Sequence, residues 1–160
     1  MGKILKIKKY PDKILREGSR AVEKIAETET KLFEDMFSTM RNSSGIGLAA
    51  PQVGINQKLI VADIDGQLLK LANPEVIKAE GKDKMEEGCL SVPGVLVNIE
   101  RAYEVVVKGL NENGELVEIK ARGLLARILL HEIDHLNGKL IIDYMNFFKK
   151  VRFKICGRNK

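Results

Sequence analysis

The sequence contains no run of about 18 consecutive apolar residues, and this absence excludes a helix that spans a membrane. Residues 1–6 alternate lysine with aliphatic residues and lack the apolar core that a signal peptide needs. We therefore expect a cytoplasmic protein that has no membrane partner.

Cysteine is also scarce, since only Cys89 and Cys156 occur in 160 residues. A disulfide is not expected in a reducing compartment, so a metal-ligand role for at least one cysteine is the better interpretation. The length suits one globular domain, and 44% apolar with 31% charged residues is ordinary for a soluble folded chain. We therefore expect residues 1–160 to form a single domain.

Acidic residues are missing from the C-terminal tail, residues 148–160, which holds six of the 27 basic residues. The other 21 basic residues face 22 acidic ones, so the net charge of +5 belongs to this tail. One interpretation is a solvated, fraying end that aids solubility. The other is an anchor for a polyanion such as RNA, whereas a DNA partner is not expected.

The apolar pattern predicts two helices and two hairpins. Spacings of three and four predict helices over 28–41 and 123–136, the second ending at Asn137-Gly138. Asp65-Gly66 and Asn113-Gly114 predict hairpin turns. Extended segments are predicted at 59–64, 67–72, 75–80, 103–109, 115–122 and 139–144, with Asn73-Pro74 ending the second of them. Without regular βαβ alternation, this order predicts an α+β domain with antiparallel or mixed β-sheets around a central helix.

The only two histidines lie four residues apart, in His131-Glu132-Ile133-Asp134-His135. On a helix this spacing places both imidazoles on one face, where they could bind one metal ion. Glu132 is then a candidate group for proton transfer. The alternative is a polar helix face that carries two histidines without binding a metal.

Leu124 and Ile128 precede the histidines on the same helix face. They could line a pocket for an apolar substrate side chain beside the metal. Core packing would produce the same pattern, so both interpretations stay open.

A catalytic metal usually has three protein ligands, so two histidines require a third. No glutamate or histidine follows His135, and Asp143 is the only acidic residue left downstream. The third ligand is therefore Asp143, a cysteine or an upstream residue. Cys89 is the better cysteine because Gly88 allows a close approach, and its thiolate suits Zn(II) or Fe(II). Cys156, near the end of the chain, is interpreted as a spare thiol.

A glycine-rich segment, residues 45–54, partly matches a dinucleotide-binding fingerprint. That site needs a strand before it and a helix after it, whereas here a helix is predicted before it and Pro51 disfavours a helix after it. We therefore expect no nucleotide site. The glycines instead allow another backbone to come close, and Gln52 presents an amide from the same segment.

Taken together, three segments resemble the bacterial peptide deformylases. That family shows Gly-x-Gly-Leu-Ala-Ala-x-Gln, Glu-Gly-Cys-Leu-Ser and His-Glu-x-x-His in this order, and the chain has all three at 45–52, 87–91 and 131–135. The spacing and the overall length also fit. The match is less close at Leu130, where many relatives have glutamine, and at Leu96, expected in a loop where some relatives carry an arginine near the substrate.

The resemblance implies a metal-dependent hydrolase that releases formate from the N-formylmethionine of nascent polypeptides. It implies that Cys89, His131 and His135 hold one divalent metal, with Fe(II) as the native ion, Zn(II) plausible, and Ni or Co able to substitute. Glu132 would act as general base and acid. Gln52 and the backbone N–H of Leu90 would stabilise the oxyanion.

The resemblance also implies a set of substrate-binding residues. Gly45 and Gly47 would let the peptide lie alongside as an added strand, and Glu87 would lie beside the substrate and orient a metal ligand. Asp134 would pair with Arg101 or another base. The methionine pocket would be lined by Ile46, Met85, Leu124 and Ile128.

Two other functions are weighed against this one. The first is a zinc peptidase that uses Asp143 as its third ligand. The second is a ribosome- or RNA-associated module that uses the basic tail and keeps a structural metal. A combination of deformylase activity with ribosome association is also expected, in which the basic tail helps dock the enzyme near emerging nascent chains.

Overall fold

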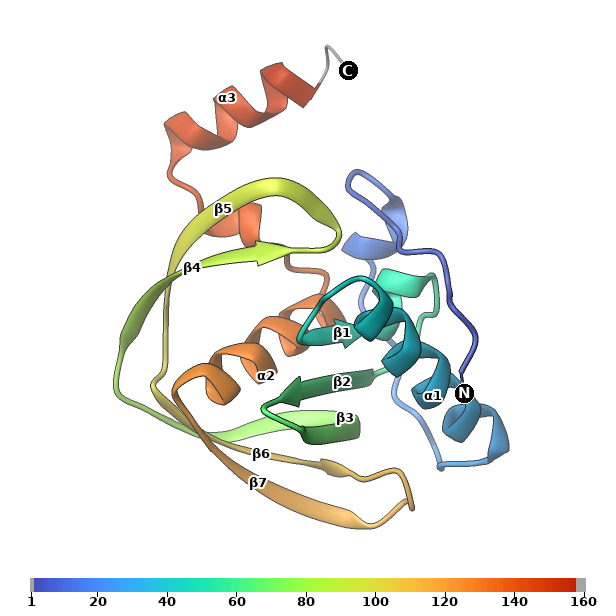
Figure 1. Ribbon diagram of the computed structural model, residues 1–160. Coiled ribbons are helices and arrows are strands. Elements are labelled where there is room, and N and C mark those ends of the chain that lie inside the picture. Colours follow the sequence, from blue (N-terminus) through green and yellow to red (C-terminus); the bar gives the residue numbers. More distant parts are fainter. Residues whose placement is uncertain (1, 158–160) are drawn as a thin grey trace.

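The computed structural model describes residues 2–157 and shows a five-stranded sheet, a separate β-hairpin and a helix between them (Figure 1). The sheet has the order β1-β2-β3-β6-β7, and each neighbouring pair is antiparallel. Its strands are Gly47–Ala49, Leu59–Ile64, Gln67–Glu80, Glu104–Leu110 and Leu116–Arg122. The separate hairpin pairs β4, Asp83–Cys89, with β5, Val92–Arg101. The α+β prediction is therefore confirmed.

The two predicted hairpin turns are confirmed. Asp65 and Gly66, which link β2 to β3, have φ values of 51° and 83°, and Gly114, in the link from β6 to β7, has a φ of 77°. Glycine and aspartate tolerate this left-handed conformation better than most residues do. The turns that the sequence predicts therefore set the pairing register of β2 with β3 and of β6 with β7.

The prediction that Asn73-Pro74 ends a strand is wrong. β3 continues through this dipeptide to Glu80, with a shift in its pairing to β6 between Ala72 and Glu75. Asn73 has a φ of 51°, and its side chain exchanges two hydrogen bonds of 2.8 Å with the backbone of Val22. The bulge accommodates the proline, which has no N–H for the ladder.

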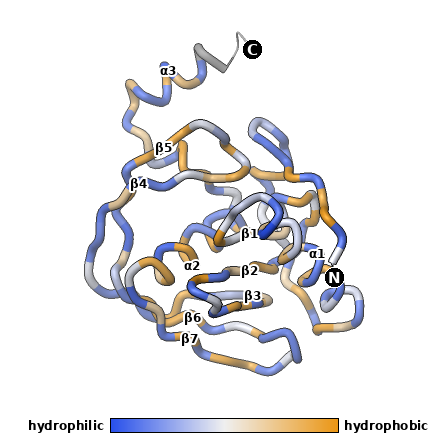
Figure 2. The backbone as a smooth tube through the Cα atoms, viewed as in Figure 1, coloured by the Kyte–Doolittle hydropathy of each residue, from blue (hydrophilic) through white to orange (hydrophobic). Residues whose placement is uncertain are grey.

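Helix α2, Gly123–Leu136, has the bounds that the sequence predicts. Ala126, Leu129 and Leu136 are buried against the five-stranded sheet, and Gly138, with a φ of 73°, follows the end of the helix. Figure 2 shows hydrophobic residues on α2 and β2 in the middle of the fold, with hydrophilic residues at the outer turns. Burial of this apolar face therefore fixes α2 on the sheet.

The segment 139–144 was predicted to be extended, and this prediction is wrong. Residues Ile141–Tyr144 form a 3-10 helix, η3, in which Asp143 accepts a hydrogen bond from the backbone N–H of Leu140 at 2.9 Å. Leu140 to Ile142 are buried against the β4–β5 hairpin and the 3-10 helix η1, Lys13–Arg16. The apolar residues that suggested a strand therefore belong to a 3-10 helix that is buried in this core.

The remaining helices lie outside this centre. Helix α1, Glu27–Asn42, matches the predicted range within one residue and packs through Phe33, Met36 and Met40. The start of the basic tail lies in helix α3, Phe147–Gly157. The side chain of Cys156 and all of residues 158–160 lie outside the described residues. Within residues 2–157, no helix has the length and apolar character that a bilayer crossing requires.

Candidate active site

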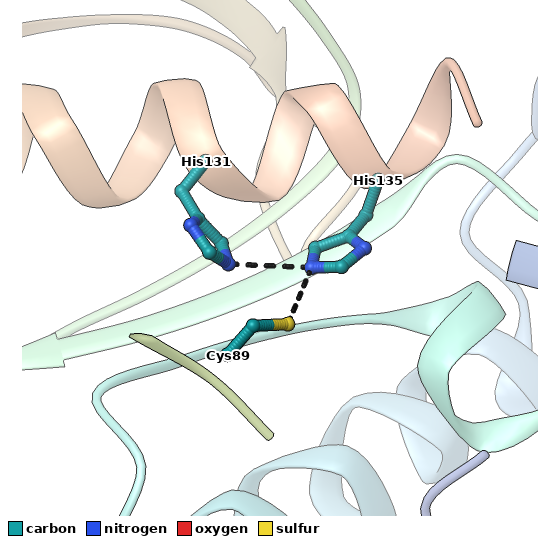
Figure 3. A group of neighbouring side chains, drawn as sticks. All are labelled: Cys89, His131 and His135. Carbon is teal, nitrogen blue, oxygen red and sulfur yellow. Dashed lines mark hydrogen bonds between the residues drawn. The ribbon is translucent and has the colours of Figure 1, made fainter. Parts of the chain in front are cut away.

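Three metal-ligating side chains converge between α2 and the end of β4 (Figure 3). The Nε2 atom of His135 lies 3.3 Å from the Nε2 atom of His131 and 3.3 Å from the Sγ atom of Cys89. The ligating atoms of the three residues all lie within 4.8 Å of one another. The structure therefore brings together the three residues that the sequence singles out.

The spacing of these atoms fits a metal ion. Tetrahedral bonds of about 2.0–2.1 Å to nitrogen and about 2.3 Å to sulfur place neighbouring ligand atoms roughly 3.3–3.6 Å apart. One thiolate and two imidazoles suit Zn(II), Fe(II) and similar first-row ions. The donor set therefore fits a divalent metal and leaves a coordination position for water.

Glu87 orients the first histidine. One oxygen of its carboxylate lies 2.8 Å from Nδ1 of His131, which directs Nε2 toward Cys89 and His135. Arg101 donates to both oxygens of Glu87, at 2.6 and 2.8 Å, and Arg127 donates to one of them at 2.5 Å. Burial alone would raise the pKa of Glu87, but hydrogen bonds from Arg101 and His131 outweigh it and lower the pKa to about 2. The carboxylate is therefore ionised at neutral pH.

The pKa values of the two histidines shift in opposite directions. Burial would lower the pKa of His131, but hydrogen bonds with Cys89 and Glu87 outweigh it and raise the pKa to about 10. Burial lowers the pKa of His135 well below its usual range. The surroundings that favour a proton on His131 also favour a divalent cation at the same place.

Asp134 extends this network on the other side of Arg101. Its carboxylate accepts a hydrogen bond from Arg101 at 2.9 Å and one from the hydroxyl of Tyr144 at 2.5 Å. The expected Asp134–Arg101 pair is therefore present. No hydrogen bond joins the Asp134 carboxylate to the side chains of the candidate metal ligands, so its role is to hold Arg101.

Glu132 is buried directly over strand β1. It is 3% exposed, and one of its oxygens has no hydrogen-bond partner among the described residues. A Cβ atom at Gly47 would collide with the carboxylate and lie 2.8 Å from Cγ2 of Ile128, so this position requires glycine. Burial raises the pKa of Glu132 to about 7. A carboxyl group with this pKa can both accept and release a proton near neutral pH.

Gln52 lies beside the cluster, in the 3-10 helix η2, Ala50–Val53. Its oxygen accepts a hydrogen bond from the backbone N–H of Ala49 at 2.9 Å. Its amide nitrogen donates to Oγ of Ser91 at 3.2 Å and lies 3.7 Å from Sγ of Cys89. Both contacts fix the N–H groups of the amide beside the candidate metal ligands.

A cleft of about 420 Å³ opens onto the cluster and contains every substrate-binding residue named from the sequence. Ile46, Met85 and Leu124 are each more than 40% exposed at its rim, whereas Ile128 is buried in its wall. The sequence did not identify Arg127 as a lining residue, although it lies four residues before His131 and so shares its helix face. The cleft is lined by Ser44, Gly45, Ile46, Gly47, Gln52, Met85, Glu86, Glu87, Gly88, Cys89, Leu90, Leu124, Arg127, Ile128, His131 and Glu132.

The structure removes one alternative ligand and corrects one expectation about the position of a residue. Asp143 does not join the cluster, because its two oxygens bind Arg16 at 2.6 and 3.0 Å. This removes the peptidase arrangement with Asp143 as third ligand. Leu96 lies in strand β5 rather than in a loop and is 65% exposed. Leu130 is partly buried and packs against the core of the sheet.

Comparison with known proteins gives one consistent result. A family model described as polypeptide deformylase matches residues 4–151. The peptide deformylase of Thermodesulfovibrio yellowstonii is 47% identical over 156 residues, covering 94% of this chain and 94% of the relative. The peptide deformylase of Halothermothrix orenii is 51% identical over 142 residues, covering 88% and 92%.

Solved structures agree with the sequence comparison. The peptide deformylase of Legionella pneumophila has a TM-score of 0.90 and 42% identity, covering 98% of this chain and 99% of its own. That of Ehrlichia chaffeensis in complex with actinonin has a TM-score of 0.91 and 39% identity, covering 99% of both chains. The chain therefore belongs to the polypeptide deformylase family, the metal-dependent hydrolases that remove the N-formyl group from peptides.

Proposed function

We propose that the chain hydrolyses the N-formyl group of N-formylmethionyl nascent polypeptides at the Cys89-His131-His135 cluster. The observation that carries this proposal is the position of Glu132, buried over Gly47 and beside three atoms spaced as metal ligands. When bound there, a divalent metal would supply Lewis acidity and a water molecule with a lowered pKa.

In this proposal, Glu132 accepts a proton from the attacking water as the new C–O bond forms at the formyl carbon. The C–N bond then breaks, and Glu132 gives the proton to the departing amine, so that the products are formate and a free N-terminus. The amide of Gln52 and the backbone N–H of Leu90 donate hydrogen bonds to the carbonyl oxygen as it becomes negative. One such donor is worth about 3–4 kcal/mol.

Substrate binding follows from the position of the cleft beside strand β1. β1 is an edge strand, so a peptide can add to the segment around Gly45 and Gly47 as a further strand. The methionine side chain would occupy the apolar part of the cleft. Its walls are Ile46, Met85, Leu124 and Ile128.

The metal is proposed to be Fe(II), with Zn(II), Ni(II) or Co(II) able to take its place. The thiolate and imidazole donors suit all four ions, so which ion occupies the site depends on metal supply and redox conditions. Purification without oxygen, followed by elemental analysis of the bound metal, tests this part. One Fe per chain is expected, and one Zn per chain from anaerobic cells would contradict it.

Release of formate from a formyl-methionyl tripeptide tests the reaction itself. The wild-type chain is assayed without oxygen, with and without a chelator, beside Glu132→Ala. We expect formate release that the chelator abolishes and that the variant nearly lacks. No formate from the wild type with any divalent metal would overturn the proposal.

Docking of the basic tail on the ribosome is also part of the proposal. Four basic residues of helix α3, which projects from the body on the far side of the hairpin, lie in the described part of the tail (Figure 1). These residues are Lys149, Lys150, Arg152 and Lys154. Binding to RNA through them should weaken steeply as the salt concentration rises.

Deletion of residues 149–160 tests this docking by co-sedimentation with ribosomes. The matched control replaces four exposed lysines outside α3 with glutamine, and it is expected to bind as the wild type does. The control positions are Lys6, Lys24, Lys31 and Lys78. Unchanged sedimentation of the deletion variant would overturn this part, whereas formate release should persist in both proteins.

A further inference from the structure

The candidate metal ligands come from two elements, a strand of the separate hairpin and a helix that packs on the five-stranded sheet. Cys89 ends strand β4 of the separate hairpin, whereas His131 and His135 lie on α2, which packs on the five-stranded sheet. The distance between the thiol and the imidazoles therefore depends on the groups that join the hairpin to α2.

Arg127 is one of these groups, and it reaches both strands of the hairpin from α2. Its Nη2 atom donates to the carbonyl oxygen of Asp83 on β4 at 2.6 Å. Its Nη1 atom donates to the carbonyl oxygen of Ile99 on β5 at 2.9 Å and to the carboxylate of Glu87 at 2.5 Å. The side chain of Arg127 is 4% exposed, so these bonds are shielded from water.

The bond to Glu87 completes the partners of that carboxylate. One of its oxygens contacts His131 Nδ1 and Arg101 Nη2, and the other accepts from Arg101 Nε and Arg127 Nη1. A carboxylate offers about four acceptor positions, so all are used. A change at Arg127 therefore frees one position and lets the carboxylate move relative to the histidine.

We propose that Arg127 is a positioning residue that sets the orientation of His131 through Glu87 and holds the hairpin at the distance that the metal ligands require. Loss of an outer group that helps to orient a metal ligand typically weakens the affinity of the site for the metal 10- to 100-fold. Lysine can replace it only in part, because one ammonium group cannot reach all three acceptors that the planar guanidinium reaches together. The inference rests on the metal site of the proposed function.

The test measures Zn(II) affinity, by competition with a chelator, in Arg127→Met and Arg127→Lys. The matched control is Arg16→Met, which removes an arginine that also holds a carboxylate and a carbonyl oxygen, those of Asp143 and Gly138, away from the cleft. We expect a 10- to 100-fold weaker affinity in Arg127→Met, a smaller loss in Arg127→Lys and less than a twofold change in the control.

A second readout separates positioning from general destabilisation. The chain has only two histidines, so the ring N–H signals of the Zn(II)-loaded protein are simple to assign by NMR after ¹⁵N-histidine labelling. The Nδ1–H signal of His131 should move in Arg127→Met and Arg127→Lys and stay in place in Arg16→Met. A merely structural role would not move it in a folded variant.

Three outcomes overturn the proposal: a folded Arg127→Met with wild-type Zn(II) affinity, an unmoved His131 signal, or failure of both Arg127 variants to fold. Failure of the proposed metal site has a different signature, because the wild-type chain would then bind no Zn(II) or Co(II), whereas failure of the proposed reaction appears only in the formate assay. The two results are therefore distinguishable from the same titrations.

Discussion

The two sheets of this protein are joined to helix α2 by different kinds of contact. The five-stranded sheet meets α2 through buried apolar side chains, among them Leu71, Val107 and Leu129. The β4–β5 hairpin meets α2 through charged groups, in which Arg101 and Arg127 share Glu87. Apolar contacts are not directional, whereas hydrogen bonds to charged groups fix both distance and angle. The first kind of contact stabilises the fold, and the second positions the candidate metal ligands.

Cys89→Ala should have the largest effect, because it removes the contribution of the hairpin to the metal site. We expect the metal content to fall from one ion per chain to almost none, and formate release to fall with it. Loss of a ligand should weaken binding by more than the roughly 100-fold that outer groups can cause. Elemental analysis after gel filtration measures this.

Asp143→Asn is the matched control for the loss of Cys89. Its carboxylate binds Arg16 and the backbone of η3 rather than the cluster, so the metal content should not change. A Cys89→Ala protein that keeps one metal per chain would contradict the assignment of the thiol as a ligand.

Glu132→Ala should have the next largest effect, on chemistry alone. Removal of a general acid and base lowers the rate about 10²- to 10⁴-fold. Glu132 is buried and one of its oxygens is unpaired, so the variant should keep its metal and unfold at the same or a higher temperature. Formate release, metal analysis and thermal unfolding measure the three quantities, and a loss of activity below tenfold would count against the role of Glu132.

Leu71→Ala tests the other side of the comparison, the apolar sheet. Leu71 is 1% exposed and packs in the cluster that supports α2. Its truncation should cost about 2–5 kcal/mol of unfolding free energy and leave the activity per folded molecule unchanged. Urea unfolding measures this beside Leu116→Ala, a 63% exposed control, and a change in metal content of the folded protein would break the comparison.

The same difference explains which parts of the molecule the sequence predicted. Helix α2, both glycine turns and the strand at 59–64 follow from local periodicity and turn chemistry, and the structure confirms them. The ligand set could also be proposed, because the two histidines are the only ones and the resemblance covers nearly the whole chain.

The parts that were missed depend on contacts between distant residues. The hairpin β4–β5 was not predicted, although Val97 and Ile99 alternate with exposed residues, because charged residues dominate β4. The bulge at Asn73 depends on a hydrogen bond to a residue 51 positions away, and η3 depends on a core formed with η1. Arg127 was missed because its partners lie 28 to 44 residues away in the sequence.

The smallest expected effect is on the free energy of unfolding in acid, and it tests the charged contact of Glu87 with Arg101 and Arg127 alone. The folded-state pKa of Glu87 is lowered from 4.5 to about 2, so its contribution to stability is fully present above pH 4.5 and is lost as the pH falls toward 2. This contribution is about 3 kcal/mol, and Glu87→Gln removes it. The unfolding free energies of the metal-free wild type and Glu87→Gln should therefore differ most near neutral pH and converge in acid.

The control is Glu80→Gln, which removes only an exposed pair with Lys78. Its unfolding free energy should differ little from that of the wild type at any pH. A wild-type advantage over Glu87→Gln that stays constant from neutral pH into strong acid would mean that the buried carboxylate does not hold the hairpin through its charge.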